Sequence, residues 1–236
     1  VSLRVRGREE DRFGQAEVRG SLIRRGVFFF LIGYANLAVW PGDILRVYGV
    51  AYLVAASLLT AKNGLLWAFS VGTVVAFMVL MFLLDFETNW DFATLEYANL
   101  WTISGGAMNL FFNGFRAVLP WLGYLVVGML LGRIDLTSPS TRKRLIVYGM
   151  TIFACAELIS FGLLQATTML APTIDQGIAH AILGTDSLPP MPLFLLASGG
   201  ISIAIIMICV GIAERPSMAR FVEPLASAGQ LAFTWY

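Results

Sequence analysis

The chain has 236 residues, of which 58% are apolar and 13% charged, and its formal net charge is +1 at neutral pH. Soluble domains carry about 45–50% apolar and about 25% charged residues, so this composition excludes an ordinary soluble protein. With a mean hydropathy of +0.76, the chain is predicted to be an all-α polytopic membrane protein. Its expected partner is the lipid bilayer, and we expect no nucleic-acid partner.

The first part of the chain is predicted to be a basic segment followed by three membrane spans. Residues 1–25 are rich in arginine and are expected to lie in the cytoplasm, where such segments set the topology. Apolar runs then predict spans at 26–40, 44–61 and 65–84.

The second part is predicted to hold three further spans and a truncated seventh. The connection at 85–116 mixes acidic and aromatic residues, so we expect it to lie along the extracytoplasmic interface. Spans are predicted, with their intervening loops, in this order: span 117–132, basic loop 133–144, span 145–168, outer loop 169–190, span 191–213 and polar turn 214–224.

The ends of the sequence predict a piece of a longer protein. Residue 1 is valine, and the apolar run at 225–236 stops before it could cover the about 20 residues that a helix needs to cross a bilayer. We therefore expect 1–236 to form one partial transmembrane domain with about six complete helices.

Cysteine and histidine are too scarce to support a metal centre. The two cysteines, Cys155 and Cys209, both fall within apolar runs, and His180 is the sole histidine. Neither a disulfide framework nor a metal site is predicted.

Basic residues give the expected orientation. In this topology every lysine and arginine lies on the cytoplasmic side except Arg46 and Arg116. A base placed against the positive-inside rule needs a carboxylate partner or an anionic ligand group. For Arg46 the nearby acid is Asp43, which lies three residues earlier, within pairing reach on a helix. The pair either fixes a helix end or serves a function, and the sequence leaves both open.

Three of the predicted spans are short for a bilayer. The runs at 26–40, 44–61 and 117–132 would measure about 23–27 Å as helices. They predict a vestibule that opens outward, with helix tilt or local thinning of the lipid as the alternative.

A second group of residues stands out from the apolar background. Asn113 and Gly114 predict a turn near the end of the 85–116 connection. Gly123, Gly128 and Gly132 recur along the next span at near-helical spacing, which predicts close helix packing. Glu157 is a lone acid in the middle of a span, where either a functional role or a partner on a neighbouring helix would explain it.

Three stretches carry a resemblance to a known family. They read WPGDILRVYG from residue 40, NGFRAVLPWLGYLVVGMLLGR from residue 113, and LASAGQLAFTWY at the end. The chain resembles the heparan-alpha-glucosaminide N-acetyltransferase-like group of bacterial membrane proteins, which includes the YeiB-type proteins. The resemblance covers most of the chain and implies a membrane-bound acyltransferase of the bacterial cytoplasmic membrane. Its co-substrate would be cytoplasmic acetyl-CoA or another acyl-CoA, and its acceptor an amine or hydroxyl, often on a sugar, at the outer side.

The resemblance also has two departures. The family's presumed catalytic asparagine and histidine lie on helices that would precede residue 1, so 1–236 alone is expected to be inactive and its catalytic residues are unknown. The family often has histidine-proline where this chain has Arg116-Ala117. His180 is interpreted as a solvated loop residue rather than a general base.

Acyl transfer requires donors that orient the acceptor and stabilise an oxyanion, together with a site for the CoA phosphates. The candidates for orienting the substrate are Asp43, Arg46, Asn113, Arg116 and Glu157. The candidates for binding the CoA phosphates are Arg133, Arg142, Lys143 and Arg144, which the positive-inside rule also explains as topology charges.

Two other classes of function stay open at this stage. A transporter of a small anionic solute would also place charges at membrane depth. A non-catalytic membrane protein is the third possible class.

Overall fold

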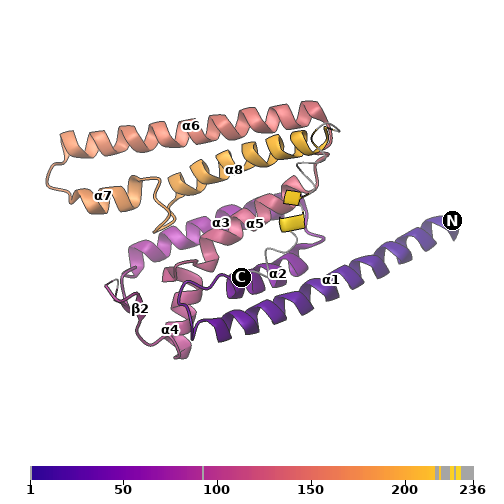
Figure 1. Ribbon diagram of the computed structural model, residues 1–236, viewed down its shortest axis with the longest axis horizontal. Coiled ribbons are helices and arrows are strands. Elements are labelled where there is room, and N and C mark those ends of the chain that lie inside the picture. The colour runs from indigo at the N-terminus through magenta and orange to yellow at the C-terminus, as the bar shows by residue number, and fades with distance from the viewer. Residues whose placement is uncertain (1, 92, 216–217, 219–223, 226, 230–236) are drawn as a thin grey trace. The chain divides into compact units, whose positions relative to one another are not determined.

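The computed structural model describes residues 2–91, 93–215, 218, 224–225 and 227–229, with side chains from residue 14 onward. Most of these residues are helical (Figure 1). The chain divides into two compact units, Val1–Leu130 and Leu131–Tyr236. The predicted truncated seventh span falls largely outside the described residues.

Unit 1 contains five α-helices, one π-helical turn and a small hairpin in its described part. The helices are α1 (Ser2–Asn36), α2 (Leu45–Leu58), α3 (Asn63–Leu83), α4 (Ile103–Met108), the π-helix Asn109–Asn113 and α5 (Val118–Leu131). The strands β1 (Trp90–Asp91) and β2 (Glu96–Tyr97) pair antiparallel, with Trp90 opposite Tyr97. The basic segment and the first predicted span thus form one continuous helix, α1, rather than a loop and a span.

Unit 2 contains three helices in its described part: α6 (Pro139–Leu170), α7 (Gln176–Leu183) and α8 (Pro192–Ala213). Helix α6 begins earlier than predicted, because Pro139 suits the first turn of a helix. The last three bases of the predicted 133–144 loop therefore lie on α6. The expected outer loop at 169–190 contains α7, which Asp175 caps by accepting the backbone N–H groups of Gly177 and Ile178.

Three described helices, α3, α6 and α8, are long and apolar enough to cross a membrane. A fourth span is possible in α4, the π-helix and α5 together, which are bent by 48° at the break between Asn113 and Val118. Helix α2 is apolar but has only 14 residues. The protein is thus mostly helical and has the apolar helices of a membrane-embedded protein.

Helices α1 and α2 approach so closely that glycine is required at their crossing. A Cβ atom on Gly33 would lie 2.2 Å from the backbone nitrogen of Arg46, and one on Gly49 would lie 2.6 Å from that of Phe30. Small residues let helix backbones approach in this way in membranes. The close packing fixes the start of α2 against the end of α1.

The core of unit 1 lies beside this crossing. Val47 of α2 packs with Leu110, Val118 and Leu122 from the π-helix and α5. These contacts bring the start of α2 and the π-helix to the same place, although more than sixty residues separate them in the sequence.

In unit 2, α6 and α8 cross through a glycine pair. A Cβ atom on Gly149 would lie 2.5 Å from the carbonyl oxygen of Gly200, and the reverse distance is the same. The glycine row predicted in α5 does not behave this way. Added Cβ atoms would meet nothing closer than 3.5 Å at Gly123 and nothing within 4 Å at Gly128. Gly123 nevertheless packs against α3, where the hydroxyl of Ser70 donates to the Gly123 carbonyl at 3.2 Å.

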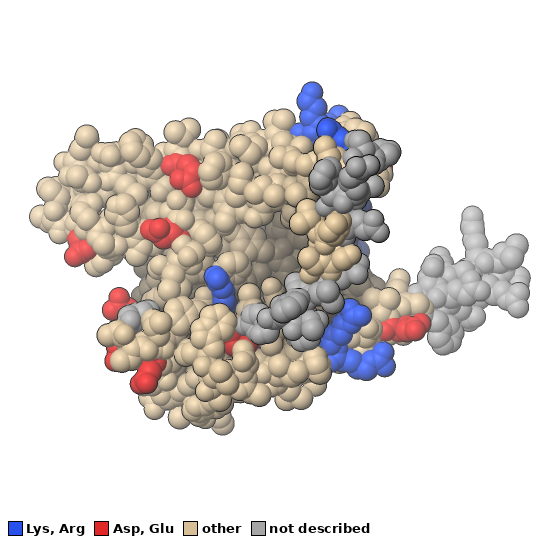
Figure 2. All heavy atoms as spheres, viewed as in Figure 1, with Lys and Arg blue, Asp and Glu red and all other residues tan. Residues whose placement is uncertain are grey.

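The charged side chains are unevenly distributed along each unit. On the face drawn in Figure 2, lysine and arginine side chains gather at the end of unit 2 where α6 begins. In unit 1 they gather along the first described part of α1 in the same view. Each cluster marks a helix end that we predict to be cytoplasmic.

Candidate functional site

Four polar side chains are buried together in unit 1, around the start of α2. Asp43, Arg46, Asn109 and Asn113 are each 1% exposed. Asp43 lies just before α2, Arg46 on its first turn, and the two asparagines at the two ends of the π-helix. Burying a polar group is costly unless it is hydrogen-bonded, so the partners of each group decide what the cluster can do.

Asp43 organises the helix start. Its Oδ2 accepts the backbone N–H of Arg46 at 3.1 Å, and its Oδ1 accepts the side-chain amide of Asn36 at 2.9 Å. The first N–H groups of a helix have no intrahelical partner, and a negative charge is favoured at that end. Asp43 thereby joins the end of α1 to the start of α2.

The guanidinium of Arg46 does not form the ion pair that the spacing suggested. In the part of the chain that the structure describes, no guanidinium nitrogen of Arg46 lies within 4.0 Å of a carboxylate oxygen of Asp43. The Nη2 group of Arg46 instead donates to the side-chain oxygen of Asn109. The reason is geometric, since Asp43 precedes the helix and its carboxylate turns back onto the backbone of the first turn.

Two nitrogens of Arg46 are buried without a hydrogen-bond partner among the described residues, Nε and Nη1. A guanidinium carries five N–H donors and no acceptor. Leaving buried donors unpaired costs about 1–3 kcal/mol each, and more for a charged group. The described protein groups supply no acceptors for these two nitrogens. A ligand with an anionic or carbonyl oxygen would supply them.

Asn113 has the opposite character, because every polar part of its side chain is used. Its Oδ1 accepts the hydroxyl of Tyr97 at 2.8 Å, and its Nδ2 donates to the carbonyls of Phe86 at 3.1 Å and Thr88 at 2.8 Å. Its backbone carbonyl accepts the indole N–H of Trp90 at 2.6 Å. Asn113 holds the 85–97 connection in place, and both N–H donors of its amide are used within the protein.

The π-helix sets the positions of both asparagines. Such short wide turns occur often at functional sites. The turn ends at Gly114, where a Cβ atom would lie 2.1 Å from the carbonyl oxygen of Asn109. Only glycine fits there, so Gly114 helps to aim Asn109 at Arg46.

The remaining two candidates for orienting a substrate lie outside this cluster. Arg116 is exposed, and its guanidinium carbon lies 5.3 Å from the ring centroid of Trp121, a cation–π contact. Glu157 is half-buried in the middle of α6 and belongs to the second unit. His180 is exposed in the last turn of α7.

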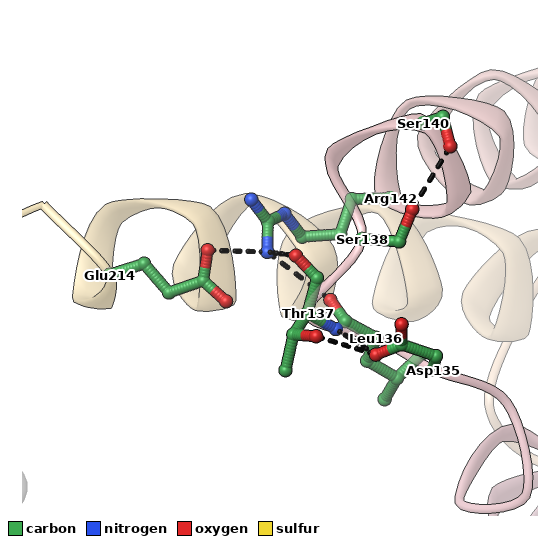
Figure 3. A network of polar contacts seen from close by, with 7 residues as sticks. All are labelled: Asp135, Leu136, Thr137, Ser138, Ser140, Arg142 and Glu214. Carbon is green, nitrogen blue, oxygen red and sulfur yellow. Dashed lines mark hydrogen bonds and ion pairs between the residues drawn. The ribbon is translucent and has the colours of Figure 1, made fainter.

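A second polar network lies in unit 2, where α6 begins and α8 ends (Figure 3). The Nη1 group of Arg142 lies 2.6 Å from Oε2 of Glu214 and also donates to the carbonyls of Leu136 and Thr137. Asp135 accepts the hydroxyl of Thr137 at 2.6 Å and its backbone N–H at 3.0 Å. These bonds, the hydroxyl bond first, lower the pKa of Asp135 below its ordinary value.

The bases expected to meet CoA phosphates are divided by the structure. Arg142 and Lys143 line a cavity of about 690 Å³ between α6 and α8, and Arg215 from the end of α8 lines it too. Arg133 and Arg144 are exposed and are not among its lining residues. Sequence reasoning counted Arg215 only as a topology charge.

Asn109 is the functional candidate that sequence reasoning missed. The signal available was its spacing of four residues from Asn113, which places both on one face of an α-helix. The π-helical turn separates their roles. Among the described residues, no group of three or more His, Cys, Asp or Glu side chains could hold a metal ion.

Comparison of the chain with protein-family models, curated proteins and solved structures finds no match.

Proposed function

We propose that this chain belongs to a membrane-bound acyltransferase of the heparan-alpha-glucosaminide N-acetyltransferase-like type. It would move an acetyl or other acyl group from a cytoplasmic CoA thioester to an amine or hydroxyl, on a sugar or other small acceptor, at the outer side. The observation that carries the proposal is the buried guanidinium of Arg46, whose Nε and Nη1 have no acceptor among the described residues.

The chemistry requires such a group. When the acceptor nitrogen or oxygen attacks the thioester carbonyl, negative charge develops on the carbonyl oxygen. The carbon–sulfur bond then breaks and the thiol of CoA leaves. A preorganised donor at that oxygen is usually the largest single contribution to catalysis. In this proposal Arg46 supplies the donor, and Asn109 fixes the guanidinium so that Nε and Nη1 remain available.

The proton of the acceptor must go to a base elsewhere. Each carboxylate oxygen of Asp43 already accepts an N–H group, so its role in this proposal is to position the first turn of α2. His180 is exposed on α7 in the other unit. We expect the base outside the described cluster, as the family resemblance implies.

The proposed reaction also requires a topology that places the CoA thioester and the acceptor on opposite sides of the membrane. The protein would cross the bacterial cytoplasmic membrane six times before a further, seventh span, with α1 starting in the cytoplasm. The CoA phosphates would approach the exposed bases near the start of α6, among them Arg133 and Arg144, which do not line the cavity between α6 and α8. Single-cysteine labelling tests this arrangement: Asp91 should react from outside and Lys143 from the cytoplasm, and cytoplasmic reactivity at Asp91 would overturn it.

Activity is tested with the full-length protein in liposomes. Labelled acetyl-CoA is supplied on one side and an amino sugar on the other, and labelled acceptor is measured. Appearance of acetylated sugar supports the proposal. Uptake of a labelled anion with no acylated product would contradict it.

A transporter of a small anionic solute is the second candidate, and one observation favours it. The helices from Ile103 to Asn113 and from Val118 to Leu131 form a pair bent by 48°. Interrupted helices of this kind often form substrate sites in transporters. In that case the same guanidinium would bind the solute's anionic group, and the liposome assay would report uptake instead of transfer.

A further inference from the structure

The end of unit 2 where α6 begins and α8 finishes contains a groove that is charged at one end and apolar along its length. Its volume is about 690 Å³. Both helices are among those apolar enough to cross a membrane, so the groove lies at the depth where a span reaches the membrane surface. The charged residues that line it are Arg142, Lys143, Glu214 and Arg215.

The charges at this end do not cancel. Glu214 pairs with Arg142 at 2.6 Å, and Arg142 also donates to two backbone carbonyls. No ion pair engages Lys143 or Arg215 in the part of the chain that the structure describes. Glu214 is thus held by Arg142, and two exposed positive charges remain to face an anion.

The rest of the groove is lined by aliphatic side chains. Ile146 and Val147 come from α6, and Ile208 and Ile212 come from α8. Val147 is 52% exposed and Ile208 46% exposed. On helices that cross a membrane, exposed aliphatic side chains of this kind face hydrocarbon, so the groove opens toward the bilayer.

We propose that this groove binds an anionic phospholipid. Its phosphate lies between Lys143 and Arg215, and one acyl chain runs along Ile146, Val147 and Ile208. Basic pockets between transmembrane helices on the cytoplasmic side bind anionic headgroups, and each lysine or arginine near such a surface strengthens binding about fivefold. This site is separate from Arg46 and does not depend on the proposed acyl transfer.

A CoA thioester shares the phosphate chemistry but differs in its approach. It comes from water, whereas the apolar part of the groove faces the bilayer. The Arg142–Glu214 pair supports the lipid, because it neutralises the acid that would otherwise repel the phosphate.

The test measures lipid retention by the purified full-length protein. Native mass spectrometry counts phosphatidylglycerol and phosphatidylcholine retained from mixed micelles. The expected result is preferential retention of phosphatidylglycerol, weakened about 25-fold in Lys143→Gln/Arg215→Gln because two bases are lost. The matched control, Arg24→Gln/Arg25→Gln, removes two exposed bases from α1 and should leave retention unchanged.

A second variant tests the apolar part without touching charge. Ile208→Trp places a bulky ring in the groove and should also reduce retention of phosphatidylglycerol, while the wild-type melting temperature is kept. Equal retention of the two lipids, or an equal loss in the Arg24/Arg25 control, would overturn the proposal. Displacement of the bound lipid by micromolar acetyl-CoA would also overturn it, because the groove would then belong to the acyl donor.

Discussion

In both units two helices cross closely at a glycine, but the units differ in how deeply they bury their polar side chains. In unit 1 the α1–α2 crossing at Gly33 buries Arg46 and Asp43 almost completely. In unit 2 the α6–α8 crossing at Gly149 leaves the charged residues at the helix ends partly exposed. An unpaired donor at an exposed end is solvated by water, whereas an unpaired donor in the buried cluster carries a large cost. Unpaired donors are therefore costly on buried Arg46 and not on exposed Lys143.

The largest expected effect comes from adding a methyl group at the glycine where α1 and α2 cross. Gly33→Ala places a methyl group on the backbone of Arg46, and we expect a loss of about 3 kcal/mol or more, since overpacking against backbone cannot be relieved by a rotamer change. Thermal unfolding in detergent measures it. Gly72→Ala on α3, where nothing lies within 4 Å, is the matched control and should be neutral or slightly stabilising. A Gly33→Ala protein as stable as that control would show that α1 and α2 do not cross so closely.

Removing the acceptor of Arg46 should have the next largest effect. Asn109→Ala leaves the buried guanidinium without the amide oxygen to which it donates and is expected to cost about 3 kcal/mol. Asn109→Asp keeps an oxygen at that position and should lose much less. A double-mutant cycle between Arg46 and Asn109 should give a coupling energy above about 1 kcal/mol. Additive losses in that cycle would exclude the contact.

A substitution at Asp43 tests whether its carboxylate acts on the backbone or on the guanidinium of Arg46. We expect the two residues to act as a unit at the start of α2, because the carboxylate accepts the backbone N–H of Arg46. Asp43→Asn retains an oxygen acceptor and should cost about 1 kcal/mol, as expected for a helix cap rather than a buried ion pair. A loss of several kcal/mol for Asp43→Asn would instead mean that charge on the guanidinium is compensated directly by Asp43.

The exposed network of unit 2 should be far less sensitive. Arg142→Gln removes an ion pair between a 12% exposed arginine and a 41% exposed glutamate, together with two hydrogen bonds to backbone carbonyls. Because water reaches this helix end, we expect a loss of about 1 kcal/mol. Unfolding experiments at low and high salt would measure this. A loss as large as that of Asn109→Ala would remove the contrast between the two units.

The smallest expected effect is a pH dependence at Asp135. The bonds from Thr137 lower the pKa of Asp135 in the folded protein. A lowered carboxylate pKa contributes stability that is present above the unfolded-state pKa and is lost as the pH falls through the folded-state value. In Thr137→Val the hydroxyl bond is absent, so the pKa of Asp135, measured by NMR titration of its carboxyl carbon, should rise toward its ordinary value. An unchanged titration would mean that the hydroxyl does not contact the carboxylate in solution.

Part of this architecture was predictable from the sequence. Uninterrupted apolar runs gave the spans that became α3 and α8, because a run without charges over a bilayer's thickness has few alternatives. The positive-inside rule singled out Arg46, and the structure buries it. Both inferences rest on local composition, which a single sequence contains in full.

The missed features depend on which segments become neighbours. Asn109 becomes the partner of Arg46 only because the π-helix and α2 share a core. The glycines that matter, Gly33 and Gly149, are no more conspicuous in the sequence than Gly128, which lies in open space. Spacing along one helix shows that glycines share a face, but it does not show whether another helix comes close to that face.

In the proposed function, Arg46 binds an oxygen-bearing ligand and contributes little to stability. The most direct measurement is the rate of acyl transfer from labelled acetyl-CoA by full-length Arg46→Met, with its unfolding midpoint measured beside that of Arg24→Met. Arg46→Met removes two unpaired buried donors but leaves the Asn109 oxygen without its donor, so we expect it to cost at most about 3 kcal/mol of stability. Loss of one oxyanion donor reduces turnover about 100-fold or more. We expect a folded Arg46→Met protein with at least that loss of transfer and an Arg24→Met protein with full activity. A folded Arg46→Met protein that transfers the acyl group at the wild-type rate would contradict it.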